Sequence, residues 1–235
     1  MSTPLNGSIL KAFSILRLIS HERPEISASI VAAELGINNA TAHRFLLTLE
    51  ETGALVSYRR GHFCLGPMTQ ELGQIAEATN QIAAHIRPII RALARDLNES
   101  VMVCRLGRLG PTCIAVAQAE RPITVNISVG TVLPMVSSAQ GKLWLASMDP
   151  QDRSSWLKSS APNAPIDLEQ ILAEGFARNL GDNEPDIGAL AVPIWGDKGN
   201  VALTLSTFGM LSRFDDAMLE RALPGLIATA KQIRA

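Results

Sequence analysis

The sequence of 235 residues lacks three features that mark other classes of protein. It contains only three cysteines, Cys64, Cys104 and Cys113, which is typical of reduced thiols and not of a disulfide framework. No apolar run approaches the roughly 20 residues needed to cross a membrane. The start, MSTPLNGSILK, has no charged segment followed by an apolar stretch. We therefore expect a cytoplasmic protein without a signal peptide and without a membrane partner.

The composition also differs from that of a disordered chain. Hydrophobic residues make up 47% of the sequence and charged residues 18%, which is enough apolar material for packed cores. No internal repeat and no low-complexity tract is visible. A chain of 235 residues is long for one domain and comfortable for two.

The chain has almost no net charge. The formal total of −1, taken alone, argues mildly against a nucleic-acid binder. The two parts of the chain differ in charge. Residues 1–66 hold six Lys/Arg and five Asp/Glu, which gives +1, and they also hold three of the four histidines. Residues 67–235 hold fifteen Lys/Arg and seventeen Asp/Glu, which gives −2. Gly66-Pro67 interrupts the chain where the balance changes. We place the end of a first domain at residue 66.

Residues 1–66 are predicted to form three helices and a hairpin. The helices are expected over 8–20, 28–35 and 39–52, and the strands over 55–58 and 62–65. Ser8 and Asn38 are candidate helix caps, and Gly36 suits a left-handed helix end. Arg59-Arg60-Gly61 forms the tip of the hairpin. This order is that of a winged helix-turn-helix domain.

The third helix has two distinct faces. Ala42, Phe45, Leu46 and Leu49 follow helical spacing and form the buried stripe. The opposite face carries the candidate DNA-contacting residues Asn39, Ala40, His43 and Arg44, with Thr41 at its edge and in reach of a phosphate. Asn pairs with adenine, and Arg binds guanine or phosphate. The alternative is an ordinary solvated face on a three-helix domain.

The hairpin tip gathers cationic and aromatic side chains. Tyr58, Arg59, Arg60 and His62 lie where a wing contacts the phosphate backbone or the minor groove. The alternative is an ordinary charged turn exposed to solvent. If the two arginines were the only evidence, this alternative would be favoured over a DNA contact. Helix and wing in this order favour DNA binding.

Residues 67–235 mix helices and strands, which predicts an α+β fold with an antiparallel sheet. We expect a linker helix over 67–84 and a second domain over 85–235. Within them, helices are predicted over 69–84, from Pro88 to 97, and over 138–148, 150–158, 167–178 and 215–234, and strands over 100–106, 112–118, 123–128, 187–195 and 200–208.

Short motifs follow one another along nearly the whole chain. In residues 1–66 they are Ala32-Ala33-Glu34-Leu35-Gly36-Ile37, Thr41-Ala42-His43-Arg44-Phe45-Leu46, Glu51-Thr52-Gly53-Ala54-Leu55 and Leu65-Gly66-Pro67. Further on they are Arg87-Pro88, Leu97-Asn98-Glu99-Ser100-Val101, Val129-Gly130, Leu133-Pro134-Met135, the run from Ser138 to Ala146, Ala191-Val192-Pro193 and Thr204-Leu205-Ser206. In this order and spacing the sequence resembles the IclR family of bacterial transcription regulators.

The resemblance implies a winged helix-turn-helix domain, a linker helix and a GAF-like α+β domain that binds a small effector, commonly a carboxylate. It also implies a homodimer formed through the N-terminal part, or a homotetramer, that presents paired recognition helices to double-stranded operator DNA. Three positions depart from the family pattern. Ala40 replaces a frequent Ser, Gln140 replaces a small residue, and Thr207-Phe208 replaces a frequent Gly-Pro.

The candidate effector site lies at the start of the helix over 138–148. Free N–H groups at a helix start attract anions, so Ser138, Ala139 and Gln140 are positioned for a carboxylate. By resemblance the site is completed by Asp182, Ile187, Ala189, Thr204 and Ser206, with Met135 on an apolar wall. Thr204 and Ser206 alternate along one strand and share a face. Alternatively, Thr204 and Ser206 lie on the polar outer face of a sheet. For Asp182 the alternative is an ordinary carboxylate on a surface loop.

Signatures of catalysis are missing. The sequence holds no HExxH, no GxxxxGK[ST] and no GxGxxG between a strand and a helix. Ser138 and Lys142 are four residues apart, a spacing compatible with a Ser/Lys nucleophile, but a lysine in such a position more often extends to solvent. Cys104 and Cys113 fit buried thiols, because zinc would need two further ligands. We expect no catalytic residue, no cofactor and no metal.

The sequence thus predicts a regulator whose affinity for operator DNA is controlled by a small metabolite, an organic acid by resemblance. Two alternatives remain open. One is a constitutive DNA-binding protein whose second domain serves only assembly. The other is a small-molecule hydrolase with an accessory N-terminal domain.

Overall fold

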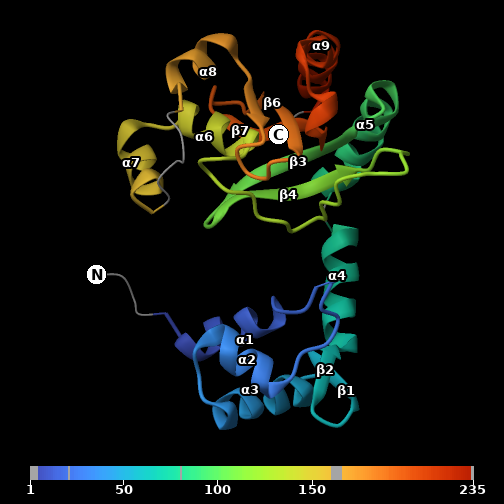
Figure 1. Ribbon diagram of the computed structural model, residues 1–235, viewed down its shortest axis with the longest axis vertical. Helices are drawn as coiled ribbons and strands as arrows, with labels where there is room; N and C mark the ends of the chain where they lie inside the picture. Colours follow the sequence, from blue (N-terminus) through green and yellow to red (C-terminus); the bar gives the residue numbers. More distant parts are fainter. Residues whose placement is uncertain (1–4, 21, 80, 160–165, 234–235) are drawn as a thin grey trace. The chain divides into compact units, whose positions relative to one another are not determined.

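The computed structural model describes residues 5–20, 22–79, 81–159 and 166–233 (Figure 1). Its contacts divide the chain into two compact units, Met1–Asn80 and Gln81–Ala235, and each unit is described by itself. Among the described residues, no helix combines the length and the apolar character needed to span a membrane.

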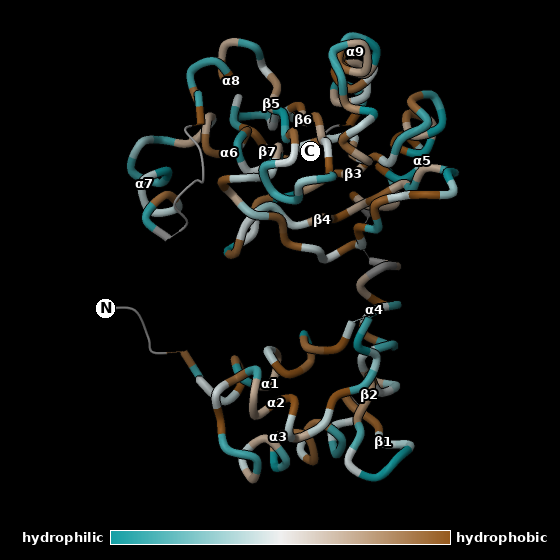
Figure 2. Tube along the Cα trace, viewed as in Figure 1, coloured by the Kyte–Doolittle hydropathy of each residue, from teal (hydrophilic) through white to brown (hydrophobic). Residues whose placement is uncertain are grey.

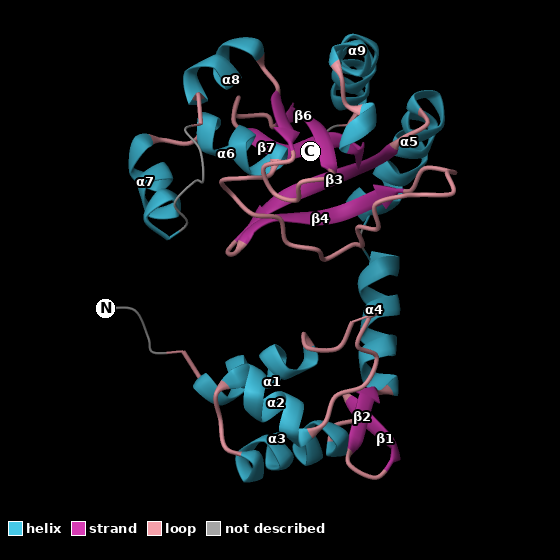
Figure 3. Cartoon of the chain, viewed as in Figure 1, coloured by secondary structure: helices cyan, strands magenta, loops and turns pink. Residues whose placement is uncertain are grey.

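The first unit is a set of helices followed by a hairpin and a further helix (Figure 3). Its elements are α1 (Gly7–Leu16), α2 (Ala28–Leu35), α3 (Asn39–Glu51), β1 (Leu55–Arg59), β2 (His62–Leu65) and α4 (Pro67–Thr79). This is the predicted order of a winged helix-turn-helix domain, and β1 and β2 pair antiparallel. The wing and the candidate recognition helix therefore belong to one folding unit.

Local capping explains where these helices begin and end. The Asn38 side chain accepts a hydrogen bond from the Thr41 backbone N–H at 2.7 Å and starts α3. Gly36, at φ 61°, ends α2 in the left-handed conformation. The prediction of Ser8 as the cap of α1 is wrong. The Asn6 side chain, one residue before Gly7, accepts from the N–H groups of Ser8 and Ile9 instead.

A backbone bridge holds the hairpin against the helices. The N–H and C=O groups of Ile26 and Phe63 exchange two hydrogen bonds of 2.8 Å, which joins the segment before α2 to β2. Both side chains are buried in one cluster, which consists of Ile15, Ile26, Val31, Ala42, Leu46, Leu49, Ala54, Leu55 and Phe63. The wing is thus anchored to the core that supports α3.

The second unit is built on one antiparallel sheet with strand order β4-β3-β7-β6-β5. Its elements are α5 (Gln81–Leu97), β3 (Ser100–Gly107), β4 (Gly110–Ala117), α6 (Ala139–Ser147), α7 (Pro150–Ser159), α8 (Leu168–Glu174), β5 (Ala177–Leu180), β6 (Ile187–Trp195), β7 (Val201–Met210), η1 (Leu211–Arg213) and α9 (Asp216–Gln232). The predicted α+β class is confirmed, and Figure 2 shows apolar segments in its helices as well as in its strands.

Helices cover both faces of the sheet. α5 and α9 pack against one face, with Leu203 and Leu205 of β7 among the buried residues there. α6 packs against the other face. The α6-side cluster consists of Met102, Cys104, Cys113, Leu133, Ala139, Leu143, Ala177, Ala189, Ala191 and Phe208. Because neighbouring residues of a strand point to opposite faces, Thr204 and Ser206 face α6.

Two predicted elements of the second unit differ in the structure. Residues 123–128 form no strand, and the outer edge of β4 is bonded by the segment after them: Gly130 donates to the Cys113 carbonyl at 2.8 Å, and Leu133 donates to the Pro111 carbonyl at 2.8 Å. The helix predicted over 167–178 ends early, at the left-handed Gly175, because β5 begins at Ala177.

The helical stretch before the sheet also differs. The helix predicted to start near Pro88 begins at Gln81 and contains Pro88 in its interior. Proline removes one backbone donor and crowds the preceding turn, but Pro88 is exposed and α5 continues past it. The helix predicted over 69–84 is observed as α4, which ends at Thr79.

Candidate DNA-binding and ligand-binding sites

The predicted DNA-contacting residues of α3 share one exposed face. Ala42 and Leu46 are fully buried on the opposite side. Asn39, Ala40, His43 and Arg44 are exposed, and Thr41 is half-buried at the edge. A shallow groove of about 500 Å³ runs along this face, lined by Ala28, Asn39, Ala40, His43, Arg44 and Leu47.

Arg44 presents an uncompensated positive charge. Within the described part of the chain, its guanidinium forms no ion pair and no side-chain hydrogen bond. Besides the backbone bonds of the helix, its carbonyl accepts from the Thr48 hydroxyl at 2.8 Å. A free guanidinium on an exposed helix face can bind a phosphate or the edge of a guanine.

The four predicted wing residues fall into two groups. Arg59 donates through Nη2 to Glu25 Oε2 at 3.0 Å, and His62 Nδ1 lies 3.5 Å from the same carboxylate oxygen. Tyr58 is 86% exposed, and Arg60 is exposed without an ion pair to any described residue. Arg60 is therefore the uncompensated charge of the tip, whereas Glu25 partly neutralises Arg59.

Sequence reasoning missed Glu25. It lies 34 residues before Arg59 and reaches the wing because its neighbour Ile26 is bridged to Phe63. No local pattern signals such a contact.

The start of α6 is tightly organised. Ser138 is buried, and its Oγ accepts from the Gly141 N–H at 3.0 Å while donating to the Pro134 carbonyl at 2.5 Å. The N–H groups of Ala139 and Gln140 have no acceptor within the helix, as in the first turn of any helix. These two donors, together with the helix dipole, favour a negative charge here.

The sheet beneath α6 contributes buried hydroxyls. Thr204 and Ser206 are both fully buried, so the alternative of a polar outer sheet face is wrong. Gln140, also buried, donates through Nε2 to Ser206 Oγ. Thr204 Oγ1 has no hydrogen-bond partner among the described residues. The structure thus joins Gln140, in the first turn of α6, to Ser206, and Thr204 lies two residues away on the same face of β7.

The remaining predicted ligand residues surround this centre. Ala189 lies in the α6-side cluster with Ala139, and Ile187 is half-buried at the start of β6. Met135 belongs to a neighbouring cluster with Trp144. Its backbone carbonyl lies so close to Gly141 that a side chain at that position would collide with it. The loop before α6 and the first turn of the helix therefore pack as one body.

Asp182 lies at the rim of the site. Its Oδ2 pairs with Lys142 Nζ at 2.5 Å, and the Asp182 side chain is 44% exposed whereas that of Lys142 is 13% exposed. Lys142 also donates to the Arg178 carbonyl at 3.0 Å. The expectation that Lys142 extends to solvent is wrong, since Asp182 and the β5 backbone hold it. Ser138 and Lys142 thus have separate partners and do not form a nucleophile–base pair.

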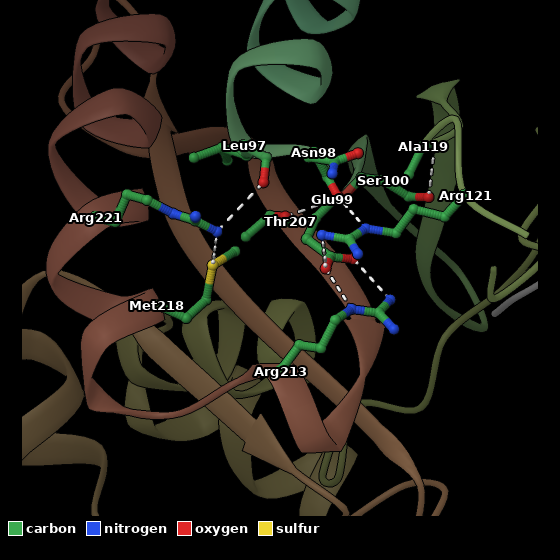
Figure 4. Close-up of polar contacts among 10 residues, drawn as sticks. All are labelled: Leu97, Asn98, Glu99, Ser100, Ala119, Arg121, Thr207, Arg213, Met218 and Arg221. Carbon is green, nitrogen blue, oxygen red and sulfur yellow. Dashed lines mark hydrogen bonds and ion pairs between the residues drawn. The ribbon is translucent and has the colours of Figure 1, made fainter. Parts of the chain in front are cut away.

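A second charge network was not predicted. Glu99 is 1% exposed and accepts from Arg213 Nε at 2.5 Å and Nη2 at 2.9 Å, and Arg121 Nη2 lies 3.4 Å from its Oε1 (Figure 4). The Glu99 hydrogen bond raises the pKa of Arg213. A side chain at Gly209 would collide with the Glu99 carboxylate. The network ties the start of β3 to η1 and to the loop after β4.

No group of three or more His, Cys, Asp or Glu side chains arranged to hold a metal ion occurs in the part of the chain that the structure describes. The titratable groups under α6 include two thiols, Cys104 and Cys113.

Comparisons with known proteins cover nearly the whole chain. The family model described as bacterial transcriptional regulator IclR C-terminal matches residues 75–235, and the IclR helix-turn-helix domain matches residues 8–57. The HTH-type transcriptional regulator KipR of Bacillus subtilis is 25% identical over 228 residues, which cover 91% of this chain and 90% of the relative.

Two solved structures are similar. The IclR transcriptional regulator from Alicyclobacillus acidocaldarius has a TM-score of 0.83 at 25% identity, with 98% of each chain covered. An IclR homolog from Microbacterium hydrocarbonoxydans, complexed with 4-hydroxybenzoate, has a TM-score of 0.74 at 21% identity, with 97% of this chain and 99% of that chain covered. Sequence motifs, domain order and these matches agree, and this chain belongs to the IclR family of bacterial transcriptional regulators.

Proposed function

We propose that this protein is a transcriptional regulator that binds double-stranded operator DNA through α3 and the wing, and that a small organic acid bound under α6 controls its affinity. The exposed face of α3 with its uncompensated Arg44 carries the proposal. The proposal includes the division of the chain into a DNA-binding domain over 1–66, a linker over 67–84 and an effector-binding domain over 85–235.

In the DNA complex, α3 enters the major groove. Asn39 at its first turn suits adenine, and Arg44 suits guanine or phosphate. Arg60 reaches a phosphate from the wing, because it is exposed and carries an uncompensated charge. Ala40 offers no hydroxyl for a phosphate, so Thr41 and backbone N–H groups supply positioning contacts there.

The effector is held by the start of α6 and by β7. A carboxylate accepts from the N–H groups of Ala139 and Gln140, and the rest of the ligand meets Thr204, whose hydroxyl lacks a partner among the described residues. Gln140 bonds to Ser206 in the present structure, so an entering ligand displaces its side chain. The 4-hydroxybenzoate complex of a structural neighbour makes aromatic acids the first class to test.

A gel-shift experiment tests the DNA mode. Duplexes selected by the wild-type chain from a random library serve as probes. Arg44→Ala is expected to weaken binding by about 1–3 kcal/mol, because it removes a base or phosphate contact. Arg108→Ala, in the exposed turn between β3 and β4, removes the same charge far along the chain and is the matched control. Equal affinities of the two variants would contradict the docking of α3.

A thermal-shift screen of small aromatic and aliphatic acids tests the effector site. Hits are expected to raise the melting temperature of the wild-type chain and to be lost in Ser138→Trp, which blocks the helix start. Hits that persist unchanged in this variant place the site elsewhere. A chain that binds operator but responds to no acid favours constitutive DNA binding, and conversion of a bound acid to product would favour the hydrolase alternative.

A further inference from the structure

Two of the three cysteines form a cross-strand pair inside the second unit. Cys104 on β3 lies directly opposite Cys113 on β4. The backbone of Cys113 bonds outward, since its N–H donates to the Thr131 carbonyl at 2.9 Å and its carbonyl accepts from Gly130 at 2.8 Å. The two cysteines are therefore a non-hydrogen-bonded antiparallel pair.

This kind of pair suits a disulfide. In a non-hydrogen-bonded pair the Cα atoms are about 4.5 Å apart and the side chains are closer than in the other pair type. Disulfides need Cα separations of about 4.4–6.8 Å. A bond between Cys104 and Cys113 is thus compatible with the pairing of the two strands, whose register shifts between Val103 and Cys104, and both thiols are free in this structure.

The pair lies in the floor of the candidate ligand site. Both thiols are buried and belong to the α6-side cluster with Ala139 at the helix start. On the other side of Cys104, the neighbouring strand places Thr204 directly opposite, and the Thr204 hydroxyl has no partner among the described residues. A row of two thiols and one unsatisfied hydroxyl therefore crosses three strands beneath α6.

The two thiols are chemically unequal. The hydrogen bond between them lowers the pKa of Cys113 and raises that of Cys104, and the burial of Cys104 adds to its rise. Thiolates, not thiols, are the nucleophiles. Cys113 also lies on the edge strand β4, whereas Cys104 lies on the inner strand β3, so Cys113 is suited to react first with Cys104 beside it.

Helix α6 and a loop both pack on the cluster that contains the pair. Val125 and Ile127 pack on the α6-side cluster and remain partly exposed. Local opening of such loops costs less free energy than opening a helix or a central strand. Such local opening lets a reagent close to water in size reach the sulfur atoms of Cys104 and Cys113.

We propose that Cys104 and Cys113 form a peroxide-sensitive dithiol that closes reversibly to a disulfide. The Cys113 thiolate attacks one oxygen of hydrogen peroxide; the S–O bond forms, the O–O bond breaks, and hydroxide leaves and takes a proton to become water. The Cys104 sulfur then attacks the Cys113 sulfur, the S–O bond breaks, and the departing hydroxide takes the Cys104 proton. Two thiols and one peroxide give one disulfide and two waters.

The backbone connects this pair to the helix start. The loop segment that bonds to Cys113 continues to Leu133, which donates to Pro111, and then to Pro134. The Pro134 carbonyl accepts from both the N–H and the hydroxyl of Ser138. A shift of Cys113 on oxidation thus reaches the groups proposed to hold the acid. This coupling rests on the proposed function, whereas the disulfide itself does not.

The test uses the full-length chain with Cys64→Ser, which leaves only the two thiols of interest. The folded protein is treated with hydrogen peroxide, then unfolded and labelled with N-ethylmaleimide, and its intact mass is measured. Two labels are expected before treatment, and no label with the loss of two hydrogen atoms after it. Dithiothreitol should restore both labels. Retention of both labels after peroxide, with an unchanged circular dichroism spectrum, would overturn the proposal.

Matched single variants test the order of reaction. In the same background, Cys104→Ala should leave Cys113 as a sulfenic acid that dimedone traps, and Cys113→Ala should leave Cys104 reacting far more slowly. Equal trapping in both variants would contradict the roles given to the two sulfurs.

A final comparison separates the disulfide from its effect. The acid found by thermal shift is titrated against the reduced and the oxidised chain, and different affinities are expected. Equal affinities would overturn the coupling to α6. A reduced chain that binds no acid would instead count against the proposed effector function, while the mass measurement still decides on the disulfide.

Discussion

Thr204 and Thr207 lie on the same strand and are both fully buried, yet their hydroxyls differ. Thr207 Oγ1 donates to the Ser100 carbonyl at 3.1 Å, whereas Thr204 Oγ1 has no partner among the described residues. A buried polar group without a hydrogen bond costs about 1–3 kcal/mol. The protein carries this cost beneath α6, where a ligand could supply the missing partner.

Valine has the shape of threonine without the hydroxyl, and it therefore tests this difference. Thr204→Val is expected to raise the free energy of unfolding by about 1 kcal/mol and to weaken acid binding, because the unsatisfied hydroxyl is removed. Thr207→Val is expected to lower the free energy of unfolding by about 1 kcal/mol, because the Ser100 carbonyl loses its donor. Urea denaturation of both variants measures the two values. If Thr204→Val destabilised the protein as much as Thr207→Val, the Thr204 hydroxyl would not be the unsatisfied group.

At the scale of elements, the wing is shaped by a partner outside it. Glu25, before α2, pairs with Arg59 and approaches His62. A surface ion pair of this kind adds little stability, about 0–1 kcal/mol, but it offsets positive charge at the hairpin. Arg60 is left as the uncompensated positive charge of the tip, and we propose it as the principal phosphate contact.

Salt dependence of DNA binding distinguishes the two arginines. Each phosphate contact contributes about 0.9 to the slope of the logarithm of affinity against the logarithm of salt concentration. Arg60→Ala should lower the slope by about that amount, and Arg59→Ala should lower it less because Glu25 already compensates this charge. Glu25→Gln should steepen it. Titrations of one duplex over a range of salt concentrations measure the slope for all three variants. Identical slopes for the two arginine variants would contradict the different roles given to Arg59 and Arg60.

At the scale of the whole molecule, the first unit exposes large apolar side chains on two of its helices. Ile9, Leu10 and Phe13 of α1 are 56%, 53% and 61% exposed, and Leu72 and Ile75 of α4 are 56% and 50% exposed. Contiguous exposed apolar residues mark sites of association. We propose that the α1 face is covered by a second copy of the chain. The formal charge of the first domain is only +1 from its Lys, Arg, Asp and Glu residues, so one copy alone should bind DNA weakly.

A charge in the α1 face tests assembly. Phe13→Glu is expected to convert the proposed homodimer or homotetramer into smaller species, because burial of a phenylalanine contributes about 1.5–3 kcal/mol. Operator affinity should fall with it, since paired half-sites need two recognition helices on one assembly. Leu109→Glu, at a residue that is 63% exposed in the second unit, is the control. Sedimentation velocity gives the size of each variant, and unchanged sedimentation of Phe13→Glu would exclude the α1 face.

The sequence by itself determined the features that depend on neighbouring residues. Helical periodicity selected the buried and exposed faces of α3, the Asn38 and Gly36 signals set helix ends, and the strands that form β3, β4, β6 and β7 were predicted close to their observed bounds. These features follow from local propensity and from the 3.6- and 2-residue periods.

The tertiary structure decided the features that join distant segments. The short edge strand β5 forms by pairing with β6, and the edge of β4 is closed by a hydrogen bond from Gly130 to Cys113. Glu25 pairs with Arg59, which lies 34 residues further along the chain. Gln140 and Ser206, 66 residues apart, meet only when α6 packs on β7. Such contacts form because burial of the apolar faces brings remote residues together, and no local pattern in the chain encodes which polar groups then meet.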